Sequence, residues 1–273
     1  RVCFDPNVMP YRDDYYGRRL AEFYDFHDEY RNRPDVSFFV DEAVASGGPV
    51  LEVGCGTGRV LIPTARAGVP VAGLDFSQTM LDICREKLSG EPVEVRERAR
   101  LVQGDMRDFA LGETFRLVTL PFRPFQHLLT VEEQLDCLAC IRRHLDGGGH
   151  VILDVFNPSL DRIAAKTPSD EFDEGKPFTL PDGCRVQRRA RVIDCDRFAQ
   201  QLHIELYYDM THADGRSERA VEPLTLRYFC RYEVEHLLAR AGFEVTGLFA
   251  DYDRSPFGSK DPGELIVMAR RPN

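Results

Sequence analysis

The chain has 273 residues, of which 43% are hydrophobic and 29% charged, as in ordinary globular proteins. Its formal net charge of −10 argues against binding to a phosphate backbone, which depends on Lys and Arg to neutralise the phosphates. No apolar run approaches the roughly 18 residues of a membrane span, and the first residues, 1–10, lack the apolar centre of a signal peptide. We therefore expect a cytoplasmic protein with no nucleic acid partner and no membrane.

The eight cysteines and seven histidines do not form an evident metal site. Cytosolic cysteines are more often buried small hydrophobic residues than disulfide partners. Cys137 and Cys140 are the only pair at C-x-x-C spacing, and they fall inside a predicted helix without a second pair. The histidines show no H-x-x-x-H spacing. We therefore predict that the chain binds no metal.

Residues 11–46 are predicted to be helical, because apolar and aromatic side chains recur at helical spacing from Tyr16 to His27. Alternating strands and helices follow, with Ser77 capping the second helix and Gly147–Gly149 ending the third. This alternation predicts a doubly wound parallel sheet with ligands at the carboxyl ends of its strands. The predicted strands are 50–53, 70–75, 101–103, 115–120 and 150–156, and the predicted helices are 59–67, 77–88 and 131–145.

The alternation of strands and helices breaks after residue 157. The segment 158–181 is the least ordered connection, and three alternating stretches then indicate an antiparallel insertion with a turn at Asp214 and Gly215. Four arginines between 185 and 191 alternate with apolar residues, as on a solvated strand face. The insertion stretches are 184–194, 201–210 and 220–229, and a helix at 232–240 and strands at 243–250 and 264–269 complete the core.

The most informative stretch is the apolar strand 50–53, which runs into Gly54, Gly56 and Gly58. Alternating glycines allow backbone angles that a Cβ forbids and let a ligand approach the main chain closely. A dinucleotide fingerprint would need glycine or alanine at the next position, where this chain has Arg59. Several nucleotide-like cofactors share this loop geometry and Arg59 speaks against a dinucleotide, so the residues that end the next strands decide between them.

Two further strands end in residues suited to such a ligand. Asp75 ends the second strand, 21 residues after Gly54, and can hold ribose hydroxyls, while the third strand ends in Gly104, Asp105 and Met106. The glycine loop, Asp75 and the segment 104–106 follow three successive strands. In this order and spacing, these three motifs resemble those of the class I S-adenosylmethionine-dependent methyltransferases. The resemblance implies S-adenosylmethionine as cofactor and an α/β fold, a Rossmann-like doubly wound sheet of seven mostly parallel strands with a final antiparallel strand.

The resemblance assigns roles to the residues of the glycine loop. Gly54, Gly56 and Gly58 lie against the methionyl part of the cofactor, whose carboxylate is favoured by backbone N–H groups. Glu52 lies beneath the loop and orders it, or binds the ligand's ammonium through water. Arg59 either reaches the methionyl carboxylate or lies exposed at the start of a helix.

The motifs at the ends of the second and third strands are expected to hold the nucleoside. Asp75 accepts hydrogen bonds from both ribose hydroxyls, and Asp105 accepts one from the adenine amino group. The Met106 backbone meets a ring nitrogen, and Phe76 lies either on a face of the adenine or in the core.

The segment 120–128 follows the fourth strand and is expected to face the methyl group. It lacks the N/D-P-P-Y/F signature of amide and base methylation, and it resembles the loop of amino-sugar N,N-dimethyltransferases in having a phenylalanine followed by a histidine and a leucine. On this match His127, with an unperturbed pKa near 6.5, is the general base, although it could instead cap the next helix. Phe122 and Phe125 are expected to wall the substrate pocket, and Arg123 to pair with an anionic substrate group.

Four tyrosines of the N-terminal segment complete the predicted site, if this segment folds over it as a lid. A tyrosine offers a hydrogen-bonding tip and an aromatic face for an ammonium, although each of the four would otherwise be core. They are Tyr11, Tyr15, Tyr16 and Tyr24.

We predict a methyltransferase that acts on a small-molecule acceptor, with an amine nitrogen favoured over oxygen or sulfur. Methylation of oxygen or sulfur, a non-catalytic S-adenosylmethionine-binding protein and a nicotinamide oxidoreductase remain alternatives, and the oligomeric state is open. The expected organisation is a single domain over 1–273, with a helical lid at 1–46, the cofactor-binding core at 47–157, the antiparallel insertion at 184–230 and the rest of the core at 231–273.

Overall fold

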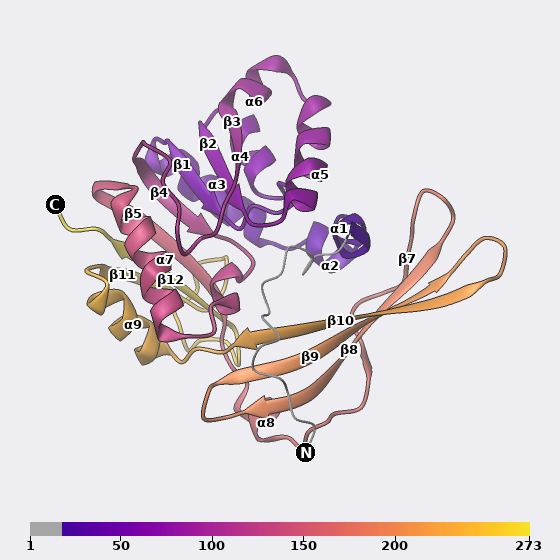
Figure 1. The fold of residues 1–273 in the computed structure, drawn as a ribbon. Coiled ribbons are helices and arrows are strands. Elements are labelled where there is room, and N and C mark those ends of the chain that lie inside the picture. The colour runs from indigo at the N-terminus through magenta and orange to yellow at the C-terminus, as the bar shows by residue number, and fades with distance from the viewer. Residues whose placement is uncertain (1–17) are drawn as a thin grey trace.

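A seven-stranded sheet forms the core of the chain in the computed structural model, which describes residues 18–273 (Figure 1). The neighbouring strands among β1 to β5 pair in parallel, whereas β12 is antiparallel to both of its neighbours. The predicted sheet with a final antiparallel strand is thereby confirmed. Across the sheet the strands are β11 (Glu244–Phe249), β12 (Glu264–Arg270), β5 (Leu145–Phe156), β4 (Phe115–Leu120), β1 (Val50–Val53), β2 (Val71–Asp75) and β3 (Ala99–Gln103).

Helices cover both faces of this sheet, because successive side chains of a strand point to opposite sides. An apolar cluster of buried side chains lies on each face of the sheet. On β4, Val118 and Leu120 belong to the first cluster and Leu117 to the second. Within residues 18–273, no helix has the length and apolar character needed to cross a bilayer. The first cluster includes α7 (Val131–Arg143) and α9 (Arg231–Arg240), the second α3 (Asp35–Ser46), α4 (Leu61–Arg66) and α5 (Gln78–Ser89), and α6 (Val93–Arg98) leads into β3.

The helical segment predicted at 11–46 is three separate helices where the structure describes it. The chain leaves the helical conformation at His27, which is extended, and Pro34 stands at the start of α3. These breaks fold α1 and α2 back over the carboxyl edge of the sheet, between the two sheets (Figure 1). The helices are α1 (Arg18–Tyr24), α2 (Asp28–Arg31) and α3.

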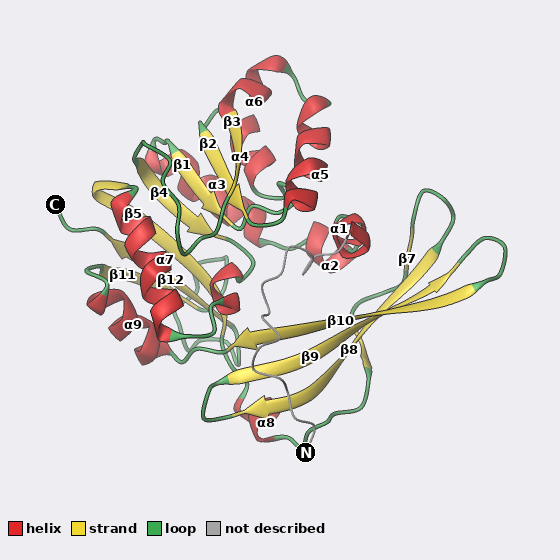
Figure 2. Cartoon of the chain, viewed as in Figure 1, coloured by secondary structure: helices red, strands yellow, loops and turns green. Residues whose placement is uncertain are grey.

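A second, antiparallel sheet is the predicted insertion, and it lies beside the carboxyl edge of the first sheet (Figure 2). Two of its three long strands pair on either side of the predicted turn at Asp214 and Gly215. The connection predicted to be the least ordered holds a short helix and two short strands. These elements are α8 (Leu160–Ala164), β6 (Phe172–Asp173), β7 (Phe178–Thr179), β8 (Arg185–Asp196), β9 (Gln201–Thr211) and β10 (Ser217–Arg227).

The glycines at 147–149 do not end a helix as predicted. α7 stops at Arg143, and the three glycines belong to the first half of β5. Gly148 has a φ of 78°, and the register with β4 shifts beside it, so the glycines bend the strand as it enters the sheet. The strand therefore begins at Leu145 and not at His150.

Candidate functional site

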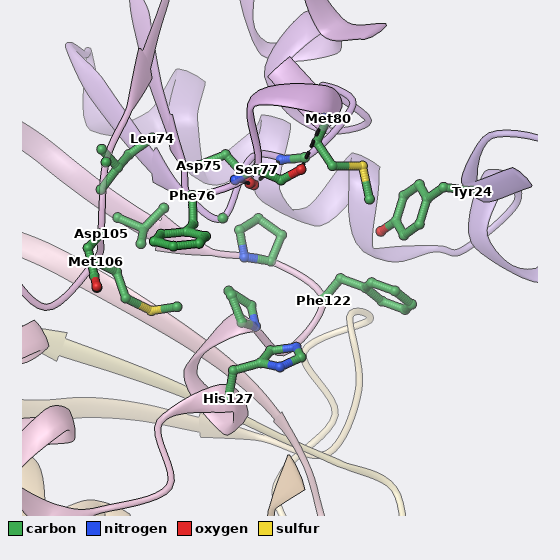
Figure 3. A pocket seen from close by; sticks show the side chains of 16 residues that line it. Tyr24, Leu74, Asp75, Phe76, Ser77, Met80, Asp105, Met106, Phe122 and His127 are labelled. Carbon is green, nitrogen blue, oxygen red and sulfur yellow. Dashed lines mark hydrogen bonds between the residues drawn. The ribbon is translucent and has the colours of Figure 1, made fainter. Parts of the chain in front are cut away.

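A pocket opens where the carboxyl ends of β1, β2, β3 and β4 meet, and we call it the strand-end pocket (Figure 3). Such a position is where open α/β sheets bind ligands. Figure 3 shows Phe76 and Met106 at one end of the pocket and Tyr24 and Phe122 at the other. The pocket is lined by Tyr24, Val53, Gly54, Gly56, Leu74, Asp75, Phe76, Ser77, Met80, Gly104, Asp105, Met106, Pro121, Phe122, Pro124 and His127.

The predicted glycine loop borders this pocket. Gly54 has a φ of 75°, and a Cβ at this position would lie 2.7 Å from the Cβ of Pro124, so a side chain is excluded by both angle and space. Gly56 has a φ of 52°, and nothing lies within 4 Å of the place a Cβ would take. The space beside the Gly56 Cα is thus open to a ligand, while the Gly56 N–H is hydrogen bonded to Asp75. Gly58 packs instead against α5, where a Cβ would meet Cys84.

Backbone N–H groups hold the carboxylate of Asp75 in the strand-end pocket. Its Oδ2 accepts a hydrogen bond from the Gly56 N–H at 2.7 Å, and its Oδ1 accepts one from the Ser77 N–H at 2.9 Å. Ser77 in turn caps α5 by accepting from the Met80 N–H. Burial raises the pKa of Asp75, and the backbone hydrogen bonds offset part of that shift. Each carboxylate oxygen keeps a second acceptor site, which suits a pair of hydroxyl donors.

An apolar slot with an acidic edge forms the opposite end of the pocket. Leu74, Phe76 and Met106 supply apolar and aromatic surface, and Asp105 stands beside them. Burial opposes ionisation of Asp105, but hydrogen bonds from the Arg107 side chain and backbone lower its pKa. A flat ring with an amino group would fit this slot, since the carboxylate can accept from the amino group.

A second cavity lies between the two sheets, and we call it the inter-sheet cavity. Its volume of about 560 Å³ is in the range of small-molecule sites. Strands β8, β9 and β10 give it an apolar wall, and charged side chains stand around that wall. These charged residues are Arg123, Arg162, Glu174, Arg188, Glu222 and Glu264.

Three side chains, Tyr24, Phe122 and His127, line both cavities, and we call this set the junction. They come from α1, from the loop after β4 and from the 3-10 helix η1 (Pro124–His127). A group bound in one cavity can therefore meet a group bound in the other at the junction. Figure 3 shows the Tyr24 hydroxyl directed into the strand-end pocket.

The protonation states at the junction follow from burial. Burial lowers the pKa of His127 to about 4, so the imidazole is neutral at physiological pH. Burial raises the pKa of Tyr24 to about 12, against the lowering effect of Arg59, so its hydroxyl keeps its proton. The junction therefore offers a neutral imidazole, a hydroxyl donor and an aromatic face.

Two predicted cofactor-binding residues lie behind the glycine loop and not in the strand-end pocket. Arg59 donates two hydrogen bonds to the fully buried Asp35, at 2.6 and 2.7 Å. It therefore forms a buried ion pair, and the prediction that it reaches a ligand or lies exposed is wrong. Its guanidinium also lies 5.2 Å from the centre of the Phe122 ring. Glu52 is buried in β1, as expected beneath the loop, and burial raises its pKa.

The segment after β4 also departs from prediction at two positions. Phe125 is fully buried and its ring lies 5.5 Å from that of Phe229, so it belongs to the core and does not wall a pocket. Arg123 lines the inter-sheet cavity, but it contacts both carboxylate oxygens of Glu264 at 2.8 Å. Its charge is therefore already compensated within the protein.

Of the four predicted tyrosines, Tyr24 lies at the junction, while Tyr11, Tyr15 and Tyr16 lie outside the described residues. Sequence analysis missed Tyr30 and Arg188, which line the inter-sheet cavity. The sequence pattern could have indicated the position of Arg188, because this residue and the apolar residues of β8 occupy even-numbered positions and so share one face of the strand. Arg188 is buried, whereas a solvated face was predicted for the arginines of this strand. Within residues 18–273, no group of three or more His, Cys, Asp or Glu side chains is placed to hold a metal ion.

Comparison with known proteins identifies a consistent set of relatives. Residues 50–149 match the family model described as a methyltransferase domain. The chain is 30% identical over 226 residues to the cypemycin N-terminal methyltransferase of a Streptomyces species, across 82% of this chain and 84% of that protein. The CcbJ methyltransferase of Streptomyces caelestis has a similar structure, with a TM-score of 0.75, 27% identity and coverage of 96% of this chain and 100% of that one.

A third relative has been solved with its cofactor. This is the S-adenosylmethionine-bound CalS10 of Micromonospora echinaspora, an amino pentose methyltransferase involved in calicheamicin biosynthesis. It matches with a TM-score of 0.65 and 25% identity, covering 96% of this chain and 98% of that one.

The Arg59–Asp35 pair predicts a specific pattern of stability. Asp35→Ala leaves the Arg59 charge buried without its carboxylate, so we expect the free energy of unfolding to fall by about 3–5 kcal/mol. A double variant, Asp35→Leu with Arg59→Met, removes both charges and should be more stable than Asp35→Ala. Urea denaturation measures both, and a double variant less stable than the single one would contradict this account of the pair.

Proposed function

The chain belongs to the class I S-adenosylmethionine-dependent methyltransferases, and we propose that it methylates a small molecule at an amine nitrogen. The observation that carries this proposal is the junction, where Tyr24, Phe122 and His127 line both the strand-end pocket and the inter-sheet cavity. Methyl transfer needs donor and acceptor in line and in contact, so two cavities that meet at one place fit the reaction. The relatives named above support a nitrogen acceptor, since one is described as acting on an N-terminus and another on an amino pentose.

The strand-end pocket fits S-adenosylmethionine residue by residue. We propose that Asp75 holds the ribose hydroxyls, that Asp105 and Met106 hold the adenine beside Phe76, and that the backbone at Gly54 and Gly56 faces the methionyl group. The open backbone at Gly56 and the two fixed oxygens of Asp75 support this assignment. When bound, the cofactor supplies an electrophilic methyl group on its sulfonium. The bulk of Phe122 and Pro124 beside the pocket helps to exclude water from it.

His127 is proposed to accept the proton or the hydrogen bond of the acceptor nucleophile. Its pKa of about 4 keeps it in the accepting, neutral form. The same low pKa makes it a weak base, and this distinguishes the possible nucleophiles. A neutral amine has a free lone pair and attacks without first losing a proton, whereas an alcohol or phenol must give its proton to a base. The burial of His127 therefore favours an amine over an oxygen nucleophile.

A panel of matched acceptors tests the acceptor atom. Amines, alcohols and thiols of the same carbon skeleton, such as benzylamine, benzyl alcohol and benzyl mercaptan, are incubated with the protein and S-adenosylmethionine. Formation of S-adenosylhomocysteine and of methylated product is measured by mass spectrometry. We expect faster transfer to the amines than to their oxygen and sulfur counterparts, and faster transfer to oxygen or sulfur would refute the amine assignment.

Asp75 is expected to be needed for cofactor binding. Replacement by alanine removes the carboxylate that would bind the ribose hydroxyls, and such charged hydrogen bonds contribute about 1.5–3 kcal/mol, or roughly 10- to 100-fold in affinity. Calorimetric titration of S-adenosylmethionine into Asp75→Ala should show a loss of this size. Asp82→Ala, which changes an exposed carboxylate on α5, is the matched control. Equal losses in both variants would contradict a direct role for Asp75.

The burial of His127 also predicts a dependence of stability on pH. Its pKa is about 4 in the folded chain and near 6.5 when unfolded, so the unfolded chain binds the additional proton between these values. Native stability should therefore be full above pH ~6.5 and fall as the pH drops toward ~4, by about 3 kcal/mol from this group. Urea denaturation across this range should show the loss reduced in His127→Gln and unchanged in His236→Gln, whose imidazole is exposed. Parallel losses in the wild type and His127→Gln would contradict the assignment.

A further inference from the structure

Arg188 is a buried cation in the wall of the inter-sheet cavity. It lies on β8, whose inward face is otherwise apolar and includes Val186, Ala190 and Val192. Arg188 is only 7% exposed, and it lines the cavity together with Ala190 and Val192. Arginine remains charged under all physiological conditions, so the charge needs a counterpart in this setting.

The guanidinium of Arg188 lies over the rings of Tyr30 and Tyr208 and forms one ion pair, with Glu174. One amino group, Nη1, lies 2.9 Å from Glu174 Oε2. The buried Nε has no hydrogen-bond partner among the described residues. Arg123 in the same cavity also has a buried Nε of this kind, but its terminal nitrogen contacts both oxygens of Glu264, whereas Arg188 contacts one oxygen of Glu174. A guanidinium has five N–H donors in a fork that matches the two oxygens of a carboxylate or phosphate, so Arg188 retains the capacity to bind a second oxyanion.

Arg188 is also close to the junction. Its guanidinium carbon lies 5.2 Å from the centre of the Tyr30 ring, and that centre lies 4.8 Å from the centre of the Phe122 ring. The guanidinium carbon is thus within about 10 Å of the centre of the Phe122 ring. A single small molecule can therefore span from the junction to Arg188.

We propose that Arg188 binds an anionic group of the acceptor, either a carboxylate or a phosphate. This inference rests on the proposed function, because it takes the inter-sheet cavity as the acceptor site. The acceptor is then an amine with an oxyanion a few bonds away: the amine lies at the junction, the anion at Arg188, and the apolar wall of β9 and β10 covers the rest. Three carboxylates, Glu174, Glu222 and Glu264, line the cavity, and Glu174 is the one in an ion pair with Arg188. An incoming anion therefore competes with Glu174 for this guanidinium.

Binding of small probe anions tests the proposal without knowledge of the natural acceptor. The dissociation constants of benzoate, phenyl phosphate and neutral benzamide are measured by ligand-observed NMR, with S-adenosylhomocysteine present. We expect at least one anion to bind more tightly than benzamide, and the stronger of the two distinguishes a carboxylate from a phosphate acceptor. Benzamide binding as tightly as both anions would overturn the proposal.

Three variants locate the effect. Arg188→Gln should weaken anion binding by roughly 10-fold or more, since hydrogen bonds to charged groups contribute about 1.5–3 kcal/mol. Arg189→Gln is the matched control, because that side chain points to the other face and pairs with Asp173 and Asp209. Glu174→Gln removes the competing carboxylate and should tighten anion binding. This gain does not depend on whether Arg188→Gln folds, and its absence would overturn the proposal.

Cofactor titration separates this inference from the proposed function. Arg188→Gln and Glu174→Gln should bind S-adenosylmethionine as the native chain does, because neither side chain lines the strand-end pocket. If the native chain does not bind the cofactor, the proposed function fails. If it binds the cofactor but no variant changes anion binding, only the assignment of Arg188 fails.

Discussion

The buried ion pair between Arg59 and Asp35 is the contact on which the arrangement of both cavities depends. Asp35 begins α3, and Arg59 directly follows the glycine loop, so the pair ties the N-terminal helices to the cofactor-binding turn. The charge of Arg59 also acts on the Tyr24 hydroxyl, whose pKa it lowers, and its guanidinium lies over the Phe122 ring. Two of the three junction residues are therefore positioned by one guanidinium, whose burial is compensated by a single carboxylate.

A second buried network fixes the loop that follows β4. The fully buried Asp154 accepts a hydrogen bond from the Phe122 N–H at 3.0 Å and one from the Tyr252 hydroxyl at 2.8 Å. Arg33 donates to the same hydroxyl and to Glu264. Phe122 has a φ of 60°, a left-handed conformation that is unfavourable for a bulky residue and is held by these contacts. The junction is thus preorganised from two sides, as in-line methyl transfer requires.

Local patterns predicted the parallel sheet well, and they predicted pairing and side-chain direction less well. The strand at 115–120 has the predicted bounds, because a continuous apolar run between turn residues is typical of a buried strand. The partner of Arg59 lies 24 residues away and is brought near only by the fold, so no spacing rule indicated it. Phe125 was misassigned because a short 3-10 helix turns it into the core. Arg188 differs from its neighbouring arginines because it lies on the face of β8 that carries Val186 and Ala190, and this face packs inward.

The most direct test of the account is a crystal structure of the protein with S-adenosylmethionine bound. The account predicts the nucleoside between Asp75 and Asp105, with the methyl group at the junction and facing the inter-sheet cavity. A cofactor bound in the strand-end pocket with its methyl group directed away from Tyr24, Phe122 and His127 would contradict the central claim, as would binding at any other place on the chain.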